Sequence, residues 1–183
     1  ARDLLGSVLV STIGGQTVAG IIVETEAYLG PHDEASHAAE RIGRTARNAT
    51  MFAAPGTAYV YRSYGLHWCL NVVTGAEGYP AAVLIRALEP RLGLETARER
   101  RGDGRADRLL MSGPGRLTQA LGITGAEDAH LLTAPPLWIQ PGTTVRDGDV
   151  AIAPRIGISR AKELPLRFLI RDSAWVSRRA PVG

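Results

Sequence analysis

The stretch between Gly20 and Gly30 constrains the fold more than any other part of this sequence. If it is extended, its side chains alternate between two opposite faces. One face would then hold Ile21, Val23, Thr25, Ala27 and Leu29, and the other Ile22, Glu24, Glu26 and Tyr28. The first face suits a core. The second carries two neighbouring carboxylates that repel each other, so it indicates either a functional site or the solvated face of an edge strand.

Strands are expected in this stretch and on both sides of it, separated by turn residues. We expect them at residues 7–11, 17–29, 57–63, 66–74 and 81–88, with tight turns at Gly14-Gly15 and Tyr64-Gly65. A helical turn is expected at residues 1–5, helices at 41–52 and 116–121, a charged helix and loop at 95–108, and short strands and turns over 130–153. With 183 residues, 45% of them hydrophobic, the chain can form one domain over residues 1–183 with its own core.

Composition argues against several kinds of site. Cys69 is the only cysteine, which excludes an internal disulfide or a cysteine-built metal site and suits a reducing compartment. The four histidines show no metal-ligand spacing, and neither of the common glycine-rich nucleotide-binding motifs is present. No apolar run is long enough to cross a bilayer, and no leader sequence is visible. We therefore expect no metal, no cofactor and no membrane association.

Charged and aromatic residues are unevenly distributed. Residues 24–40 hold five carboxylates and no Lys or Arg, whereas residues 41–76 hold four arginines and no acid. Five of the ten Phe, Trp and Tyr residues fall in the second window. The end of the chain is basic too, with seven cations against two acids over residues 155–183. Arginines interleaved with aromatic rings suit a surface that neutralises phosphates and stacks on bases, although a net charge of +3 does not by itself establish a nucleic-acid partner.

Three places stand out for their local surroundings. Tyr64 is expected at the tip of a hairpin, where its ring either separates stacked bases or folds back onto the sheet. Arg86 interrupts an apolar strand, and its burial requires an anionic partner, either a carboxylate or a phosphate. Ser112 precedes a predicted helix. The free N–H groups at the start of this helix either bind a phosphate or have no ligand.

A series of motifs resembles the alkyladenine (3-methyladenine) DNA glycosylase family. They are VETEAY at 23–28, DEASH at 33–37, RN at 47–48, MF at 51–52, PGTAYVY at 55–61, YG at 64–65, CLNV at 69–72, LIRALEP at 84–90, SGP at 112–114 and LRF at 166–168. They match in order from about residue 4 to about residue 177. The resemblance implies an α+β domain with a curved, mostly antiparallel sheet, a protruding β-hairpin and peripheral helices.

The resemblance also implies roles for individual residues. Glu26 resembles the general base that activates water, and Arg86 and His37 the residues that hold this water and the phosphate of the flipped nucleotide. Tyr28, His37 and Tyr61 resemble the walls that sandwich the base, Asn71 the residue that clashes with the amino group of guanine, and Tyr64 the side chain inserted into the duplex. Contacts with the DNA backbone are expected from Thr45, Arg47, Asn48, Leu66, His67 and Ser112, and Glu24 is expected to be structural.

The resemblance further implies a DNA glycosylase that flips out alkylated or deaminated purines and hydrolyses their N-glycosidic bond, and we predict that the enzyme is monofunctional. The expected substrates are 3-methyladenine, 7-methylguanine, hypoxanthine and ethenoadenine in double-stranded DNA, and the expected protein is a monomer inside the cell, in a bacterial cytoplasm or nucleoid. The only lysine, Lys162, lies outside every motif, so backbone cleavage through a Schiff base is not expected.

Two alternatives remain open. A non-catalytic module for distorted DNA or single-stranded nucleic acid would need the aromatic residues and arginines but not Glu26. A carboxylate-dependent hydrolase of small glycosides would need neither Tyr64 nor the basic end of the chain.

Overall fold

A long central strand, β2 (Val18–Tyr28), organises the fold in this computed structural model, which describes residues 1–102 and 104–180. One edge of β2 pairs along its length with β5 (Ala81–Leu92). The other edge pairs first with β1 (Val8–Ser11) and then with β9 (Arg167–Ile170). All of these pairings are antiparallel, so segments from both ends of the chain meet on one strand.

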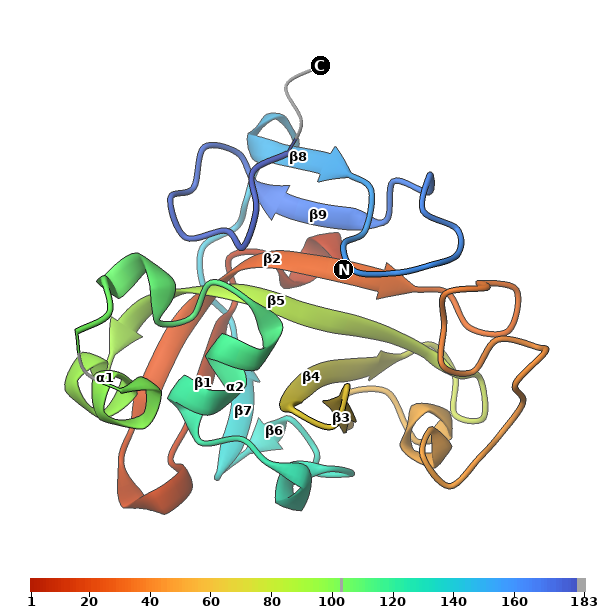
Figure 1. Ribbon diagram of the computed structural model, residues 1–183, viewed down its shortest axis with the longest axis horizontal. Helices are drawn as coiled ribbons and strands as arrows, with labels where there is room; N and C mark the ends of the chain where they lie inside the picture. Colours follow the sequence, from red (N-terminus) through yellow and green to blue (C-terminus); the bar gives the residue numbers. More distant parts are fainter. Residues whose placement is uncertain (103, 181–183) are drawn as a thin grey trace.

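The sheet continues on both sides of this centre. Beyond β5 lie β4 (His67–Thr74) and β3 (Ala58–Ser63), and beyond β1 lie β7 (Leu137–Gln140) and β6 (Thr133–Ala134). The remaining strand, β8 (Val150–Ala153), pairs with β9, and this pair lies above β2 in Figure 1. The curved antiparallel sheet and the α+β class predicted from the sequence are confirmed.

Two helices cover one part of the sheet. α1 (Leu94–Arg101) and α2 (Pro114–Leu121) lie beside each other at the left of Figure 1. Leu117, Ala120 and Leu121 of α2 pack into a core that includes residues of β1, β2 and β5. Short 3₁₀ segments lie at Arg2–Leu4, Ile13–Gly15, Ala49–Phe52, Asp107–Leu109, Gly125–Glu127 and Asp147–Asp149. In the described part of the chain, neither helix has the length and hydrophobicity of a membrane span.

The predicted strands agree well with the structure, but the regular alternation expected along β2 is wrong. A register shift against β5 lies between Ile22 and Glu24. Ile22, expected on the polar face, is fully buried in the main core, whereas Leu29, expected in the core, is 50% exposed. Both Glu24 and Glu26 are fully buried. A bulge changes which side each following residue faces. Because other strands pair with both edges of β2, it is not an edge strand.

The helix expected at residues 41–52 is also wrong. This segment forms turns, with only a short 3₁₀ turn at Ala49–Phe52. The Asn48 side chain is responsible, because its Oδ1 accepts from the Thr45 N–H at 2.6 Å and its Nδ2 donates to the Gly43 carbonyl at 2.8 Å. Asparagine side chains compete in this way with the hydrogen bonds of a helix.

Candidate active site

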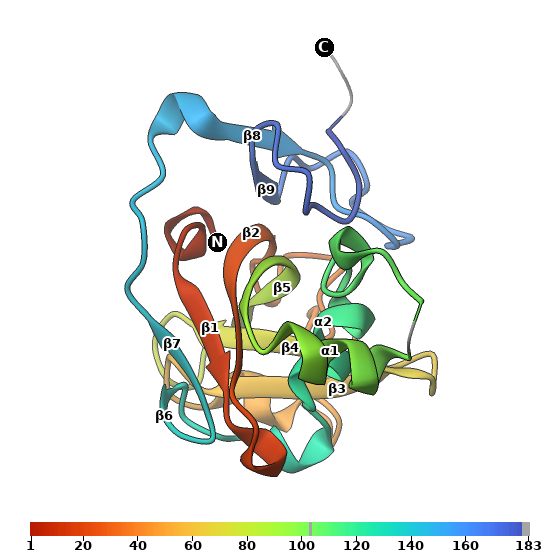
Figure 2. The same ribbon diagram turned by 90° about the vertical axis from the view of Figure 1, so that its left-hand side faces the viewer.

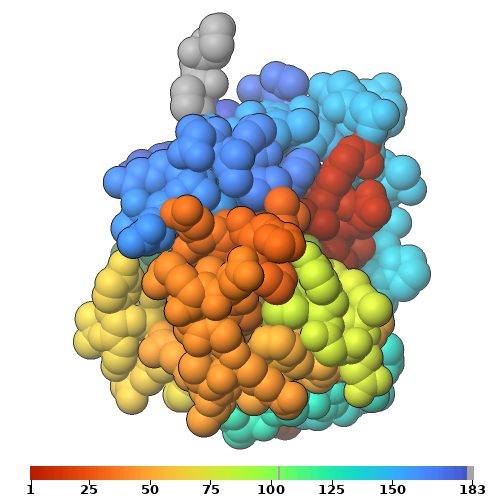
Figure 3. Space-filling model, turned by 90° about the vertical axis from the view of Figure 1, so that its right-hand side faces the viewer, coloured from red at the N-terminus to blue at the C-terminus, as the bar shows by residue number. Residues whose placement is uncertain are grey.

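A cavity of about 610 Å³ opens at the ends of several elements that are far apart in the sequence. Its walls come from the end of β2, the loop after it, strands β3 to β5, the start of α2 and residues 156–159. Figure 3 shows the loop after β2 spread across this face of the molecule, with the C-terminal segments above it. The volume lies within the range of roughly 300–1,000 Å³ that small-molecule sites occupy.

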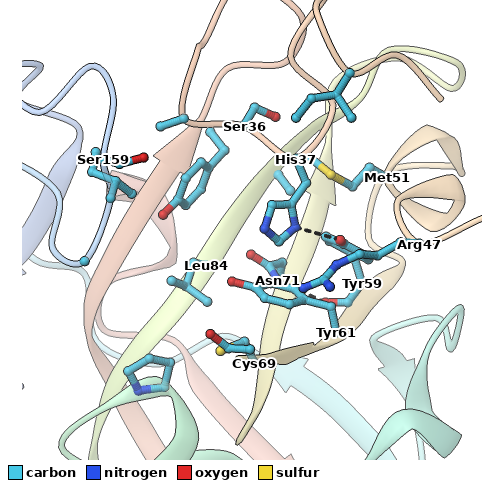
Figure 4. Close-up of a pocket in the computed structure, with 18 of the residues that line it drawn as sticks. Ser36, His37, Arg47, Met51, Tyr59, Tyr61, Cys69, Asn71, Leu84 and Ser159 are labelled. Carbon is cyan, nitrogen blue, oxygen red and sulfur yellow. Dashed lines mark hydrogen bonds between the residues drawn. The ribbon is translucent and has the colours of Figure 1, made fainter. Parts of the chain in front are cut away.

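Aromatic rings form one wall of this cavity. The rings of His37 and Tyr61 meet edge to face with centroids 4.4 Å apart, and Tyr61 stacks on Tyr59 at 5.4 Å. Figure 4 shows these side chains close together, with Ser159 on the opposite side of the cavity. Tyr28 also lines the cavity. The predicted base-binding residues Tyr28, His37 and Tyr61 are thus brought together, and an aromatic-lined slot of this kind suits a planar ligand.

Hydrogen bonds hold this wall in one arrangement. Nδ1 of His37 lies 2.9 Å from the Tyr59 hydroxyl. Burial raises the pKa of Tyr59 far above the neutral range, so its hydroxyl remains protonated. Burial also lowers the pKa of His37, and the positive charge of Arg47 adds to this effect, which favours a neutral imidazole. The uncharged His37–Tyr59 pair therefore acts as a fixed unit at neutral pH.

Asn71 presents a fixed polar group to the same cavity. It is 4% exposed, lines the cavity and lies near His37 and Tyr61 in Figure 4. Its Nδ2 donates to the Tyr59 carbonyl at 3.1 Å, which fixes the orientation of the carboxamide. A group held in this way can reject a ligand whose polar atoms do not match it.

Glu26 lies directly behind the cavity wall. Its Oε1 accepts from the Ile156 N–H at 2.7 Å and lies 3.2 Å from Nη1 of Arg86, and its Oε2 accepts from the Tyr28 hydroxyl at 3.1 Å. All three partners line the cavity, whereas Glu26 itself is fully buried. Burial raises the pKa of Glu26, with Arg86 and the two hydrogen bonds opposing part of the increase. A carboxylate with a raised pKa is a stronger base than an exposed one.

Arg86 has the anionic partner that its position in an apolar strand requires. The partners are two carboxylates of the protein, so no phosphate is required. Nε of Arg86 lies 3.1 Å from Glu24, and Nη1 contacts Glu26. Two C-terminal arginines that contributed to the expected basic end of the chain are buried as well. Arg167 pairs with Glu24 at 3.0 Å, and Arg155 pairs with Asp33 through both of its terminal nitrogens. They hold the fold together and add nothing to a basic surface.

The family assignment follows from comparison of the whole sequence. The family model described as methylpurine-DNA glycosylase (MPG) matches residues 1–174. This chain belongs to the methylpurine-DNA glycosylase family. It is 47% identical over 180 residues to a protein of Carboxydothermus hydrogenoformans, covering 98% of this chain and 92% of that protein. It is 51% identical to a protein of Granulibacter bethesdensis, covering 97% and 81% respectively. Both relatives are named "Putative 3-methyladenine DNA glycosylase".

The β3–β4 hairpin of this methylpurine-DNA glycosylase family member carries Tyr64 at its tip. Tyr64 is 87% exposed, so it does not fold back onto the sheet, and it adopts a positive φ of 50° beside Gly65. The tip projects to the right in Figure 2. Leu66 is 72% exposed and His67 is exposed next to it, and the start of α2 at Gly115 lies against His67. Tyr64 also lines the mouth of the cavity.

The residues expected along a DNA backbone fall into two groups. Thr45 and Arg47 are exposed, and the Arg47 guanidinium lies 5.6 Å from the centre of the Tyr61 ring. Asn48 and Ser112 are only 1% and 6% exposed. Asn48 donates to the His37 carbonyl at 2.8 Å, so its side chain shapes the loop and is not presented to a phosphate as expected.

Some residues of the site were missed by the sequence analysis. Residues 156–159 form part of the cavity wall, and Arg155 and Asp33 hold that segment against the loop after β2. The Arg155 guanidinium also lies 4.8 Å from the centre of the Tyr28 ring. The sequence analysis had noted only that the end of the chain, from residue 155 on, is basic. Among the residues that the structure describes, no three His, Cys, Asp or Glu side chains are grouped as a metal site would require.

Proposed function

We propose that this protein excises a damaged purine from double-stranded DNA by hydrolysing the bond between the base and its sugar. The observation that carries the proposal is the position of Glu26, whose three partners Tyr28, Arg86 and Ile156 all line an aromatic cavity. A base inside a duplex cannot reach such a cavity, so the nucleotide must first be rotated out of the stack. We propose that the protein acts on its DNA substrate inside the cell.

The exposed hairpin tip is suited to support this rotation. Tyr64 would enter the space that the nucleotide leaves, in the way that wedge side chains part stacked bases. Arg47 lines the same cavity as Tyr64, and Thr45, Leu66 and His67 are exposed and lie close to one or the other in the sequence. All four would lie along the backbone of the DNA. The flipped base would then stack between Tyr28 on one side and His37 and Tyr61 on the other. Each base–aromatic stack is worth about 1–3 kcal/mol, which offsets the cost of flipping.

Glu26 would act as the general base in the chemical step. As the glycosidic bond lengthens, its electron pair moves to the purine nitrogen and positive charge develops on the sugar. A carboxylate stabilises that charge and accepts a proton from the attacking water, whose oxygen forms the new bond to the sugar. Arg86 lines the cavity beside Glu26 and would hold the water and the nearby phosphate. The products would be the free base and an abasic site.

The fixed polar group in the cavity bears on which purines are rejected. Asn71 is oriented by its bond to the Tyr59 carbonyl and would clash with the amino group of normal guanine. We propose alkylated and deaminated purines as substrates, namely 3-methyladenine, 7-methylguanine, hypoxanthine and ethenoadenine. 7-Methylguanine keeps the amino group of guanine, so its excision would depend on its positive charge, which makes the base a better leaving group than normal guanine. The residues that line the cavity include no lysine, and we propose that the DNA backbone is left intact.

The proposal is tested by incubating the protein with methylated DNA and with end-labelled duplexes that carry one hypoxanthine or one ethenoadenine. Alkali treatment then converts abasic sites into strand breaks, and samples without alkali report backbone cleavage. Glu26→Gln should abolish excision while lesion binding persists, and Glu127→Gln, at a buried acid that instead caps a short turn, should retain activity. Binding by the wild type without excision of any lesion would contradict the proposal and favour a recognition module.

A further inference from the structure

A cluster of four buried charges lies behind the proposed general base. Its members are Glu24, Glu26, Arg86 and Arg167, which we call the buried charge cluster. The two glutamate side chains are fully buried, and the two arginine side chains are 8% and 2% exposed. Only Arg86 lines the cavity. Burial of so many charges is costly unless each has a well-placed partner, so the partners of Glu24 need an explanation.

Glu24 accepts hydrogen bonds from several donors besides Arg86. Its Oε1 accepts from Nε of Arg86 at 3.1 Å, from Nη1 of Arg167 at 3.0 Å and from the Ser177 hydroxyl at 2.9 Å. Its Oε2 accepts from the Ser177 N–H. These donors come from β5, from β9 and from the segment after β9. Glu24 thus joins three parts of the chain at a point two residues from Glu26.

The same contacts fix the orientation of Arg86. Its Nε faces Glu24, its Nη1 faces Glu26 at 3.2 Å, and its Nη2 donates to the Ser177 hydroxyl at 3.4 Å. A guanidinium is planar, so two fixed nitrogens determine the position of the third. Glu24 and Ser177 therefore determine how Arg86 meets Glu26 and which part of Arg86 faces the cavity.

Charge balance gives Glu24 a second effect on Glu26. The buried charge cluster contains two negative and two positive groups, and the backbone of Glu26 pairs with that of Arg167. Without the charge of Glu24, Glu26 would be the only carboxylate left in the cluster to balance the two arginines. The charged or titratable groups around Glu26 are Glu24 and Tyr28 on β2, Arg86 on β5, Arg167 on β9, Cys69 on β4 and Arg155 after β8. Glu24 is the only carboxylate among these neighbours.

We propose that Glu24 is a positioning residue for the excision reaction, holding Arg86 against Glu26 and offsetting the charge of Arg167 so that Glu26 remains an effective base. This inference rests on the proposed function. Ser177 contributes by donating two hydrogen bonds to Glu24, from its N–H and from its hydroxyl, which hold the C-terminal segment against Glu24. Glu24 does not touch the substrate and acts through Arg86 and Glu26.

The decisive variant is Glu24→Gln, which keeps the shape and the oxygen that accepts from Arg86 but removes the charge. Single-turnover excision should be measured against pH on methylated DNA. The rate rises with pH as Glu26 loses its proton. Removing the negative charge of Glu24 makes it easier for Glu26 to lose that proton, so the pKa of Glu26 falls. We expect this rise to move to lower pH by about one unit, because one nearby buried charge changes a pKa by that order. The plateau rate should fall about 10- to 100-fold, as small misplacements of reacting groups do.

A second measurement works without any enzymatic activity. Carbon NMR of protein labelled at its glutamate carboxyl groups follows the titration of Glu26 directly, with Glu26→Gln identifying its signal. The midpoint for Glu26 should move to lower pH in Glu24→Gln. Ser177→Ala removes one hydrogen bond to Glu24 and one to Arg86 without changing charge, and it should lower the plateau rate with little movement of the midpoint.

Glu127→Gln is the matched control, because Glu127 is also a buried acid but bonds only to Thr124. A Glu24→Gln protein with an unchanged pH profile, an unchanged Glu26 midpoint and no greater loss of rate than Glu127→Gln would overturn the inference. If the wild type excises no lesion, the proposed function fails. The NMR titration then still decides whether Glu24 controls the proton affinity of Glu26.

Discussion

The buried pair between Asp33 and Arg155 allows a quantitative prediction. Both side chains are fully buried, and two parallel hydrogen bonds join them, one of them 2.8 Å long. Arg155 also donates to the Ala27 carbonyl at 2.9 Å, while its Nε has no hydrogen-bond partner. Asp33→Ala would leave the Arg155 charge buried without a counter-charge. Removing one member of a buried ion pair costs about 3–5 kcal/mol.

This loss should be visible in simple unfolding experiments. For a chain of this size, 1 kcal/mol corresponds to about 2–4 °C in Tm, so Asp33→Ala should lower Tm by roughly 6–20 °C. Urea unfolding at neutral pH gives the free energy directly. Replacing both residues, as in Asp33→Leu with Arg155→Met, should cost clearly less than the sum of the two single changes, because no charge is then left alone.

The pH dependence of the same pair follows from its pKa. Burial alone would raise the pKa of Asp33, but hydrogen bonds from Arg155 and from the Leu29 and Ala35 N–H groups outweigh it and hold the pKa below its usual value. The stabilisation is therefore present at neutral pH and is lost as the pH falls through this lowered pKa. The exposed pair of Arg146 and Asp149 is the control, and its removal should have no measurable effect. Additive single changes, or an Asp33→Ala protein as stable as this control, would refute the reasoning.

Three further predictions concern individual positions. Tyr64→Ala should leave the free energy of unfolding within about 0.5 kcal/mol of the wild type, because the side chain is 87% exposed, but should slow excision and weaken binding of lesion duplexes; unchanged excision would exclude a role in flipping. Asn48→Ala should lower the free energy of unfolding by about 1–3 kcal/mol, since it leaves the His37 and Gly43 carbonyls without their donor. It should also slow excision, because His37 is then held less firmly. Hydrogen exchange of residues 43–48 would report the loosened loop. The wild-type excision rate should rise with pH through a pKa above that of an ordinary glutamate, because burial raises the pKa of Glu26, and a flat profile across the acid range would contradict its role as base.

Local pattern was sufficient for much of the sheet. The alternation around Tyr59 and Tyr61, the glycine beside Tyr64 and the apolar run into Arg86 predicted β3, the hairpin tip and β5. These features depend on neighbours in the sequence, since strand periodicity and turn residues act over a few positions. Local pattern failed where a side chain replaced backbone bonds, as Asn48 does, and where the bulge before Glu24 changed the facing of β2.

The chemistry of the site was predictable in kind but not in its partners. Glu26, the aromatic residues and the need of Arg86 for an anion were evident from the residues or from the family resemblance. Their partners were not, because Arg86 and Glu24 are 62 residues apart, Asp33 and Arg155 are 122 apart, and Glu24 and Arg167 are 143 apart. For the same reason, the basic composition of residues 155–183 did not reveal that Arg155 and Arg167 are buried.

The sequence by itself determined which short segments extend, where the chain turns tightly and which reactive groups are available. Only the tertiary structure decided that Glu24 and Glu26 would be buried, that Arg155 and Arg167 would neutralise carboxylates, and that residues 156–159 would close the cavity. The physical reason is that burial and charge pairing depend on which distant strands meet. In this protein β9 pairs with β2 although the two strands are far apart in the sequence. This contact brings Arg167 beside Glu24 and Glu26 behind the cavity.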